Sequence, residues 1–78
     1  MNADIMRSKA IEILLCQEDN LEERIIPEQN AVYYRNINRG GGALIMSSDG
    51  SMLFVDPFFV AFDEHLQKFI NGERSFFE

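Results

Sequence analysis

The tripeptide Ser48-Asp49-Gly50 separates two apolar runs, residues 43–47 and residues 51–55. An Asp-Gly pair between such runs is the strongest short-range signal for a β-hairpin, because both residues tolerate the backbone conformations of tight turns. The segment therefore predicts two antiparallel strands, and the rest of the chain has to supply the remainder of the sheet and its cover.

Three further segments have periodic patterns. Residues 4–17 repeat apolar side chains at a spacing of about 3.6 residues, which predicts a helix buried along one side. Residues 31–37 are rich in strand-forming residues with alternating faces, which predicts a strand. Residues 62–70 again follow the helical spacing, and Asn71-Gly72 is a typical helix end.

These elements predict a single α+β domain over residues 1–78, with an N-terminal helix, a three-stranded antiparallel meander and a C-terminal helix packed on the sheet. We expect one face of the sheet to meet both helices. Leu44, Met46, Leu53 and Val55, or their direct alternates along the strands, would line that face against Met6, Leu14, Leu66 and Phe69. A domain this small buries a modest share of its surface, so a partner or a second copy could add stability.

Residues 18–30 form a polar, acidic segment in which Pro27 prevents a continuing helix. We expect a loop or a short edge strand here. Its carboxylates belong to Glu18, Asp19, Glu22, Glu23 and Glu28. They are interpreted either as a solvated acidic edge or as a docking patch for a basic partner, and the sequence leaves both open.

The formal net charge is −6, from 7 Lys and Arg against 13 Asp and Glu. This charge repels nucleic acid and anionic membranes, so we expect neither as a partner. No apolar stretch approaches the roughly 20 residues of a membrane span, and the first residues do not resemble a secretion signal. Cys16 is the single cysteine, which excludes an internal disulfide and fits a cytoplasmic protein, and we interpret it as a small buried apolar residue.

His65 is the single histidine and lies beside Glu64 in the last predicted helix. Neighbouring helical residues do not face each other, so this pair cannot chelate one ion, and no further His or Cys cluster completes a metal site. The serines lack the G-x-S-x-G setting of a Ser-His-Asp site. We therefore expect a protein that is not an enzyme, without metal or cofactor, and we interpret His65 as a residue at the border of the apolar stripe.

Two further segments are candidate contact sites. The run Arg39-Gly40-Gly41-Gly42 precedes a predicted strand and lacks the Lys-Ser/Thr of a phosphate-binding loop. We expect either a bulged entry into the strand or a loop that contacts a partner. Phe76 and Phe77 follow the predicted end of the last helix, and they either pack back on the domain or form an oligomer contact.

Residues 42–54 combine an apolar strand with a hairpin turn, and residues 62–69 have the pattern apolar-acidic-acidic-x-Leu. Together they resemble the C-terminal half of the immunity protein 35 family, also called the YrhB-like family. The late helix is also similar to that of the SUKH superfamily of immunity proteins, although Ala61 stands where those helices often place a Ser or Thr cap. The resemblance implies a bacterial cytoplasmic protein that binds and neutralises a toxin without catalysis, and no catalytic residue carries over.

Two functions are compatible with these features. The first is an immunity-type binding module whose acidic residues and glycine run occlude the site of a basic toxin domain. The second is a small structural or regulatory homodimer, in which an exposed strand edge or the Phe-rich tail pairs two copies.

Overall fold

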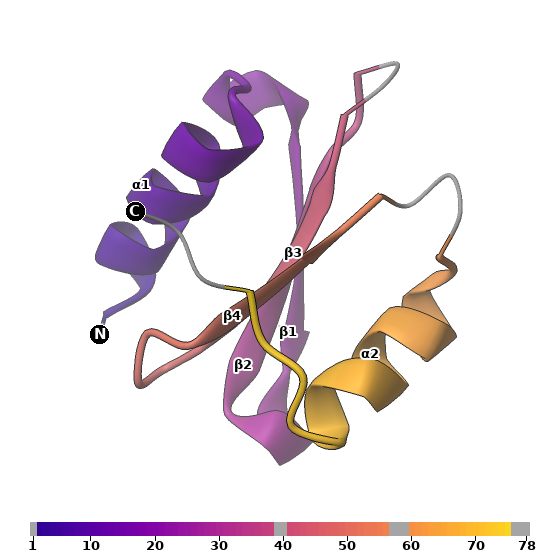
Figure 1. The fold of residues 1–78 in the computed structure, drawn as a ribbon. Helices are drawn as coiled ribbons and strands as arrows, with labels where there is room; N and C mark the ends of the chain where they lie inside the picture. Colours follow the sequence, from indigo (N-terminus) through magenta and orange to yellow (C-terminus); the bar gives the residue numbers. More distant parts are fainter. Residues whose placement is uncertain (1, 39–40, 57–59, 76–78) are drawn as a thin grey trace.

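The computed structural model describes residues 2–38, 41–56 and 60–75. A four-stranded antiparallel sheet lies between two helices, with α1 on one face and α2 on the other (Figure 1). The elements in chain order are α1 (Ala3–Leu14), η1 (Glu18–Asn20), β1 (Leu21–Ile26), η2 (Pro27–Gln29), β2 (Ala31–Asn36), β3 (Ala43–Ser47), β4 (Met52–Val55) and α2 (Phe62–Ile70), where η marks a short 3-10 turn. The strands lie in sequence order across the sheet, so the predicted α+β class with an antiparallel meander is confirmed.

The sheet has four strands, so the prediction of three was wrong. The additional strand is β1, within the acidic segment that the sequence left open between a loop and an edge strand. β1 pairs with β2 along its whole length, from Leu21 opposite Asn36 to Ile26 opposite Ala31. Charged residues have a low strand preference, and here the pairing with β2 overrides that local preference.

Helix α1 ends earlier than the apolar pattern of residues 4–17 predicts. The Asn2 side chain accepts a hydrogen bond from the Ile5 amide at 2.9 Å, which caps the first turn. The last helical residue is Leu14, because Leu15 adopts a left-handed conformation with a φ of 54°. The Asn36 side chain then donates to the Leu14 carbonyl at 3.2 Å, so a β2 residue satisfies one terminal carbonyl of the helix.

The predicted hairpin joins β3 and β4 through residues 48–50 and is confirmed. The Ser47 amide donates to the Ser51 carbonyl at 2.8 Å, which closes the loop. Gly50 supplies the positive φ of 93° that the end of such a loop requires and that other residues adopt only with strain.

The hairpin loop also decides which side chains share a face. Leu44 lies opposite Phe54, and Ile45 lies opposite Leu53. Residues directly opposite each other in an antiparallel pair point to the same face, so Leu44 and Leu53 point to opposite faces. Leu44, Met46, Leu53 and Val55 therefore do not line one face, and the alternate residue Ile45 shares a face with Leu53 instead. The expectation that one face meets both helices was wrong.

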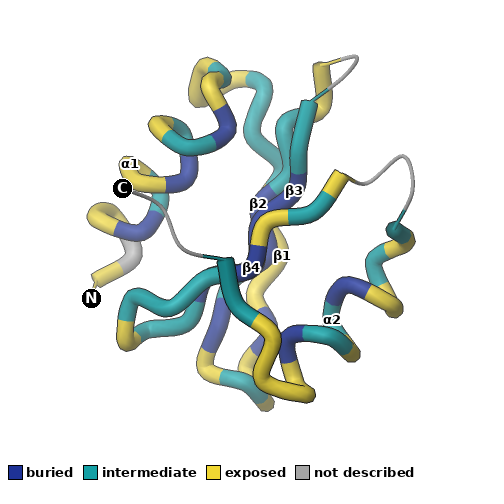
Figure 2. The backbone as a smooth tube through the Cα atoms, viewed as in Figure 1, coloured by how far each residue is buried: buried dark blue, intermediate teal, exposed yellow. Residues whose placement is uncertain are grey.

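Each face of the sheet has its own apolar core, and β3 contributes to both. Figure 2 colours residues of β3 and of both helices as buried. Under α1 the buried side chains are Met6, Ala10, Leu14, Tyr34, Leu44 and Met46. Under α2 they are Ile26, Ala31, Tyr33, Ala43, Ile45, Leu53 and Phe69, with Val55, Phe62 and Leu66 partly buried against them. The two helices therefore enclose the sheet from both sides instead of sharing one face.

The helix predicted over residues 62–70 is confirmed as α2. Its N-cap is Ala61, whose side chain makes no capping hydrogen bond, and Gly72 after its end adopts a φ of 96°. Arg74 then turns back onto the helix. Its Nη1 donates to the Phe69 carbonyl at 2.7 Å, and its guanidinium carbon lies 3.7 Å from the centre of the Phe69 ring. Arg74 thus places a cation at the negative end of the helix dipole.

Candidate functional site

The acidic residues predicted as a docking patch do not share one surface. Glu18 and Asp19 lie in η1 and Glu28 lies in η2, at opposite ends of β1. Glu22 and Glu23 are neighbours in β1, so their side chains point to opposite faces of the sheet. The structure therefore brings Glu18 and Asp19 together on one exposed turn and places Glu23 near Glu18, since both contact Arg7. Glu22 and Glu28 lie apart from them.

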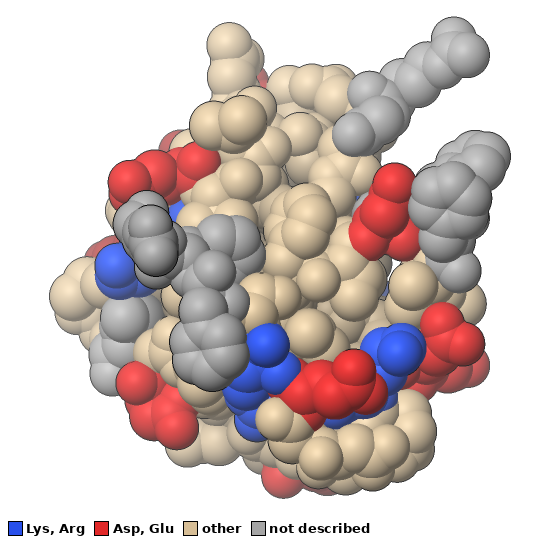
Figure 3. All heavy atoms as spheres, in the orientation of Figure 1, with Lys and Arg blue, Asp and Glu red and all other residues tan. Residues whose placement is uncertain are grey.

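Arginine side chains form ion pairs with three of the predicted carboxylates, those of Glu18, Glu22 and Glu23. Arg7 on α1 donates to both carboxylate oxygens of Glu23, at 3.1 Å and 3.3 Å, and lies 3.7 Å from Glu18. On the other face, Arg35 of β2 donates to Glu22 at 2.9 Å across the strand pair. Acidic and basic side chains also lie side by side around the rim of the face shown in Figure 3. These arginines were not among the predicted site residues, and the contact of Arg35 would have followed from pairing residues 21–26 with residues 31–36.

Part of the glycine run can be placed. The pair Arg39-Gly40 lies outside the described residues, whereas Gly41 and Gly42 lie just before β3. A Cβ atom on Gly41 would lie 2.6 Å from the Asn36 carbonyl oxygen, so the close approach of the two chain segments requires a glycine. A Cβ atom on Gly42 would overlap the Phe54 ring, which packs over this glycine. For Gly41 and Gly42 these contacts support the structural interpretation of the run.

The Phe-rich tail was the third predicted contact, and Phe76-Phe77 lies outside the described residues. Just before it, Ser75 pairs with the outer edge of β4. The Ser75 amide donates to the Met52 carbonyl at 2.7 Å, and the Phe54 amide donates to the Ser75 hydroxyl at 3.0 Å. The chain itself therefore covers part of one sheet edge, while β1 forms the other edge.

His65 is buried in the core under α2, so its interpretation as a border residue was wrong. Its Nε2 lies 2.8 Å from the Leu53 carbonyl oxygen, and its ring meets the Tyr33 ring edge-on at 5.7 Å between centroids. Its Nδ1 has no hydrogen-bond partner among the described residues. Burial lowers the pKa of His65, and the hydrogen bond with Leu53 opposes part of that shift. A neutral imidazole that donates from Nε2 therefore holds α2 against β4.

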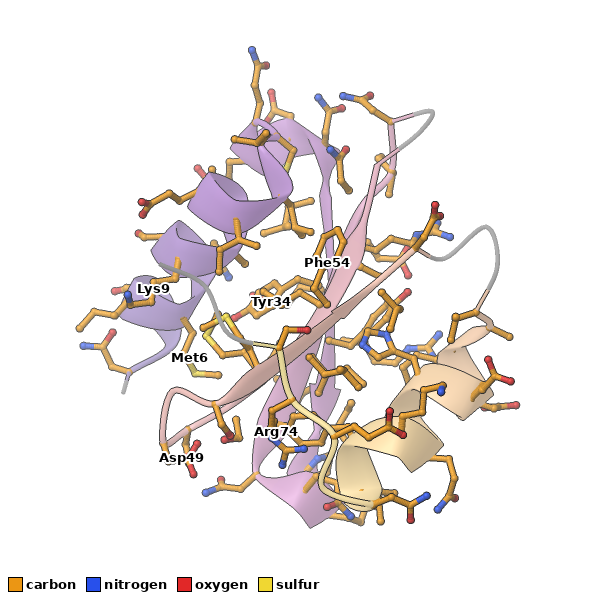
Figure 4. The ribbon with its side chains drawn as sticks, in the orientation of Figure 1. Met6, Lys9, Tyr34, Asp49, Phe54 and Arg74 are labelled. Atoms are coloured by element: carbon orange, nitrogen blue, oxygen red, sulfur yellow. The ribbon has the colours of Figure 1, made fainter. Side chains whose placement is uncertain are left out.

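Tyr34 is fully buried on the other face, beneath α1 (Figure 4). Its hydroxyl has no hydrogen-bond partner among the described residues. Burial raises the pKa of Tyr34 to about 12, the Glu23 carboxylate adds to the shift, and Arg7 opposes it. The phenol is therefore protonated at neutral pH and leaves an unpaired donor in the core.

We expect the Tyr34→Phe substitution to raise the free energy of unfolding by about 1 kcal/mol, because it removes a buried polar group that is unpaired. Urea denaturation of both proteins measures the difference. Tyr33→Phe makes the same chemical change on the opposite face, where the hydroxyl is not among the buried unpaired atoms, and should give no gain. A clear loss of stability in Tyr34→Phe would show that the hydroxyl has a partner.

A polar network at the β3–β4 hairpin did not emerge from the sequence patterns. Asp49 accepts hydrogen bonds from the Ser47 hydroxyl and from the Ser51 amide, the latter at 2.8 Å, and these bonds lower the pKa of Asp49 to about 2. The two serine hydroxyls lie 2.9 Å apart, and Arg74 Nε donates to Ser51 Oγ at 3.2 Å. The network links the segment after α2 to the hairpin (Figure 4). In the sequence, the serines on either side of the Asp-Gly turn were the one feature that could have indicated this network.

Within residues 2–38, 41–56 and 60–75, no group of three His, Cys, Asp or Glu side chains is arranged to hold a metal ion. Cys16 is half-buried beside the α1 core, and burial raises the pKa of its thiol. Neither described helix has the length and apolar character needed to span a membrane. No protein-family model, curated protein or solved structure matches the chain.

Proposed function

We propose that this chain is a non-catalytic protein-binding module of the immunity type, which binds and neutralises a basic toxin domain in the bacterial cytoplasm. The resemblance of residues 42–54 and 62–69 to immunity proteins supports this proposal, as does the net charge of −6. The observation that carries it is the pair Glu18 and Asp19, two adjacent exposed acidic residues on η1 at the start of the edge strand.

The turn η1 differs from the strand β1 in its counter-ions. Glu22 and Glu23 are bound by Arg35 at 2.9 Å and by Arg7 at 3.1 Å. Glu18 approaches Arg7 only at 3.7 Å, and its side chain is 72% exposed. A basic partner would therefore meet less compensated carboxylates at η1 than in β1, and long-range attraction would raise the association rate.

Co-expression tests the toxin-neutralising role. The probe is the product of the reading frame next to that of this chain, expressed in a bacterial host with and without it. The expected result is growth arrest by the neighbouring product alone and restored growth on co-expression. A neighbouring product without toxicity, or toxicity that co-expression leaves unchanged, would contradict the proposal.

Charge reversal tests the role of η1. We expect Glu18→Lys combined with Asp19→Lys to slow association with the neighbouring product by about tenfold at low salt, because steering acts mainly on the on-rate. Both positions are exposed, so the melting temperature should stay unchanged. Surface plasmon resonance at several salt concentrations measures the rates.

A matched control makes the same change in net charge elsewhere. Glu12→Lys combined with Glu64→Lys alters exposed residues on α1 and α2, away from η1. We expect a much smaller effect on the association rate from this variant. Equal slowing by both double variants would mean that net charge matters and that η1 is not the docking site.

The edge of the sheet favours a second candidate function, a small structural or regulatory homodimer. β1 is an edge strand, and its main contacts are with β2. Helix α1 packs chiefly on β2 and β3, and α2 packs on β3 and β4, so neither helix packs mainly on β1. An exposed strand edge presents backbone donors and acceptors that can pair with another chain.

A further inference from the structure

The outer edge of β1 presents the backbone groups of alternate residues. The Ile37 amide donates to the Asn20 carbonyl at 2.9 Å, so the backbone of Asn20 is directed toward the β2 side. Bonding direction alternates along an antiparallel strand, so Leu21, Glu23 and Ile25 direct their carbonyls away from β2. The amides of Glu23 and Ile25 point the same way, whereas the Leu21 amide donates to the Glu18 carbonyl within η1. Among the described residues, no strand pairs with this outer edge.

We propose that this edge pairs with β1 of a second copy of the chain, in an antiparallel register that places Glu23 opposite the partner's Glu23. A two-fold axis normal to the sheet relates the two copies and joins their sheets into one. Leu21 then lies opposite the partner's Ile25, and Glu22 lies opposite the partner's Arg24. The interface rests on the homodimer candidate and is independent of toxin neutralisation.

The backbone groups match in this register. The Glu23 amide of one copy meets the partner's Glu23 carbonyl, and the Ile25 amide meets the partner's Leu21 carbonyl, so outward amides meet outward carbonyls. A shift of one residue would set outward groups against inward ones and would place side chains of unlike faces together. A shift of two residues in either direction would also set like charges at the axis, Arg24 against the partner's Arg24 or Glu22 against the partner's Glu22, and it would remove the pairing of Glu22 with the partner's Arg24. Only the proposed register combines its like-charged pair at the axis with two pairs of opposite charge.

The side chains are self-complementary in the same register. On the α2 face, Glu22 meets the partner's Arg24 twice by symmetry. Arg24 is held on that face, because its guanidinium carbon lies 4.5 Å from the centre of the Phe62 ring. Opposite charges directly across an antiparallel pair attract each other, so these contacts favour the dimer.

On the α1 face, the register gives a partner to an exposed apolar side chain. Ile25 is 70% exposed, and it would pack against the partner's Leu21. Leu21 is itself partly buried at the margin of the α1 core, so the contact would extend that core across the axis. The two Glu23 carboxylates meet at the axis, where Arg7 binds each within its own copy at 3.1 Å. Their mutual repulsion is thereby reduced.

Sedimentation and hydrogen exchange of the full chain test this interface without any toxin. We expect a dimer whose population rises with protein concentration. The amides of Glu23 and Ile25 should gain protection with concentration, whereas those of Glu22 and Arg24, which bond toward β2, should be protected throughout. A monomer at every concentration, or protection of the alternate set instead, would overturn the proposal.

The Ile25→Lys substitution tests the apolar contact. Ile25 is exposed in the single chain, so the fold should be retained, and a lysine on an edge strand opposes pairing. We expect the dimer Kd to rise by at least about tenfold, because the change occurs twice across the symmetric interface. Ile70→Lys is the matched control, since Ile70 is exposed on α2, and it should leave the Kd unchanged. An unchanged Kd in Ile25→Lys would overturn the register.

Charge complementation tests the polar contact. Arg24→Glu would face Glu22 of its partner, and Glu22→Lys would face Arg24, so each variant should lose self-association. Mixed in equal amounts, the two should form a heterodimer in which opposite charges face each other again. Absence of a heterodimer from two folded variants would overturn the proposal. If Glu22→Lys fails to fold without its contact to Arg35, the comparison of Ile25→Lys with Ile70→Lys decides.

Discussion

Replacing Phe69 by alanine is expected to lower the free energy of unfolding by about 3–5 kcal/mol, the usual range for a buried phenylalanine. The Phe69 side chain is 2% exposed in the core under α2, and the Arg74 guanidinium covers its ring at 3.7 Å. The substitution leaves a cavity between helix and sheet and removes the surface on which Arg74 packs. Urea denaturation followed by circular dichroism measures the loss.

Two neighbours on α2 provide the comparison. Leu66 is only partly buried against the same core, so Leu66→Ala should cost about 2 kcal/mol, at the lower end of the range for core leucines. Ile70 is exposed, and Ile70→Ala should change stability by less than about 1 kcal/mol. Unchanged stability of Phe69→Ala would show that α2 does not pack in the core.

Lowering the pH from about 7 to about 5.5 is expected to destabilise the protein through its single histidine, His65. Burial lowers the pKa of His65 in the folded state below the ordinary value of about 6.5. The unfolded chain therefore binds the proton more readily than the folded protein does. Stability is full above about pH 6.5, falls as the pH drops through that value, and levels off once the pH is below the folded-state pKa.

The physical cause is the setting of the imidazole ring. A proton on Nδ1 would create a charge next to Tyr33 at a nitrogen that has no partner among the described residues. His65→Gln removes the titrating group, so its stability should stay level over the same pH window. Denaturation curves of both proteins at several pH values give the result, and an acid-dependent loss that persists in His65→Gln would assign the effect to other groups.

Local signals predicted the elements whose structure depends on neighbours in the chain. The Asp49-Gly50 turn and the apolar stripe from Phe62 to Phe69 both act over a few residues, and both elements formed where expected. The helix over residues 4–17 was predicted too long, because its end depends on the left-handed Leu15 and on a side chain from β2.

The strand β1 forms through pairing with β2, and the local sequence pattern of residues 21–26 does not predict that pairing. Glu22, Glu23 and Arg24 have weak strand preferences, yet β2 supplies a full set of pairing partners. The arrangement of the candidate acidic residues also depends on the pairing of β1 with β2. Glu18 and Asp19 could be identified from the sequence as an exposed acidic pair, whereas the separation of Glu22 from Glu23 follows from their being in a strand.

The sequence by itself determined the α+β class, the hairpin and the two amphipathic helices, because apolar periodicity and turn chemistry act over a few neighbouring residues. The tertiary structure alone decided that the helices cover opposite faces, that His65 enters the core and that β1 forms one edge of the sheet. The physical reason is strand register. A shift of one residue moves every side chain of a strand to the other face, and register depends on loop geometry and packing between distant segments.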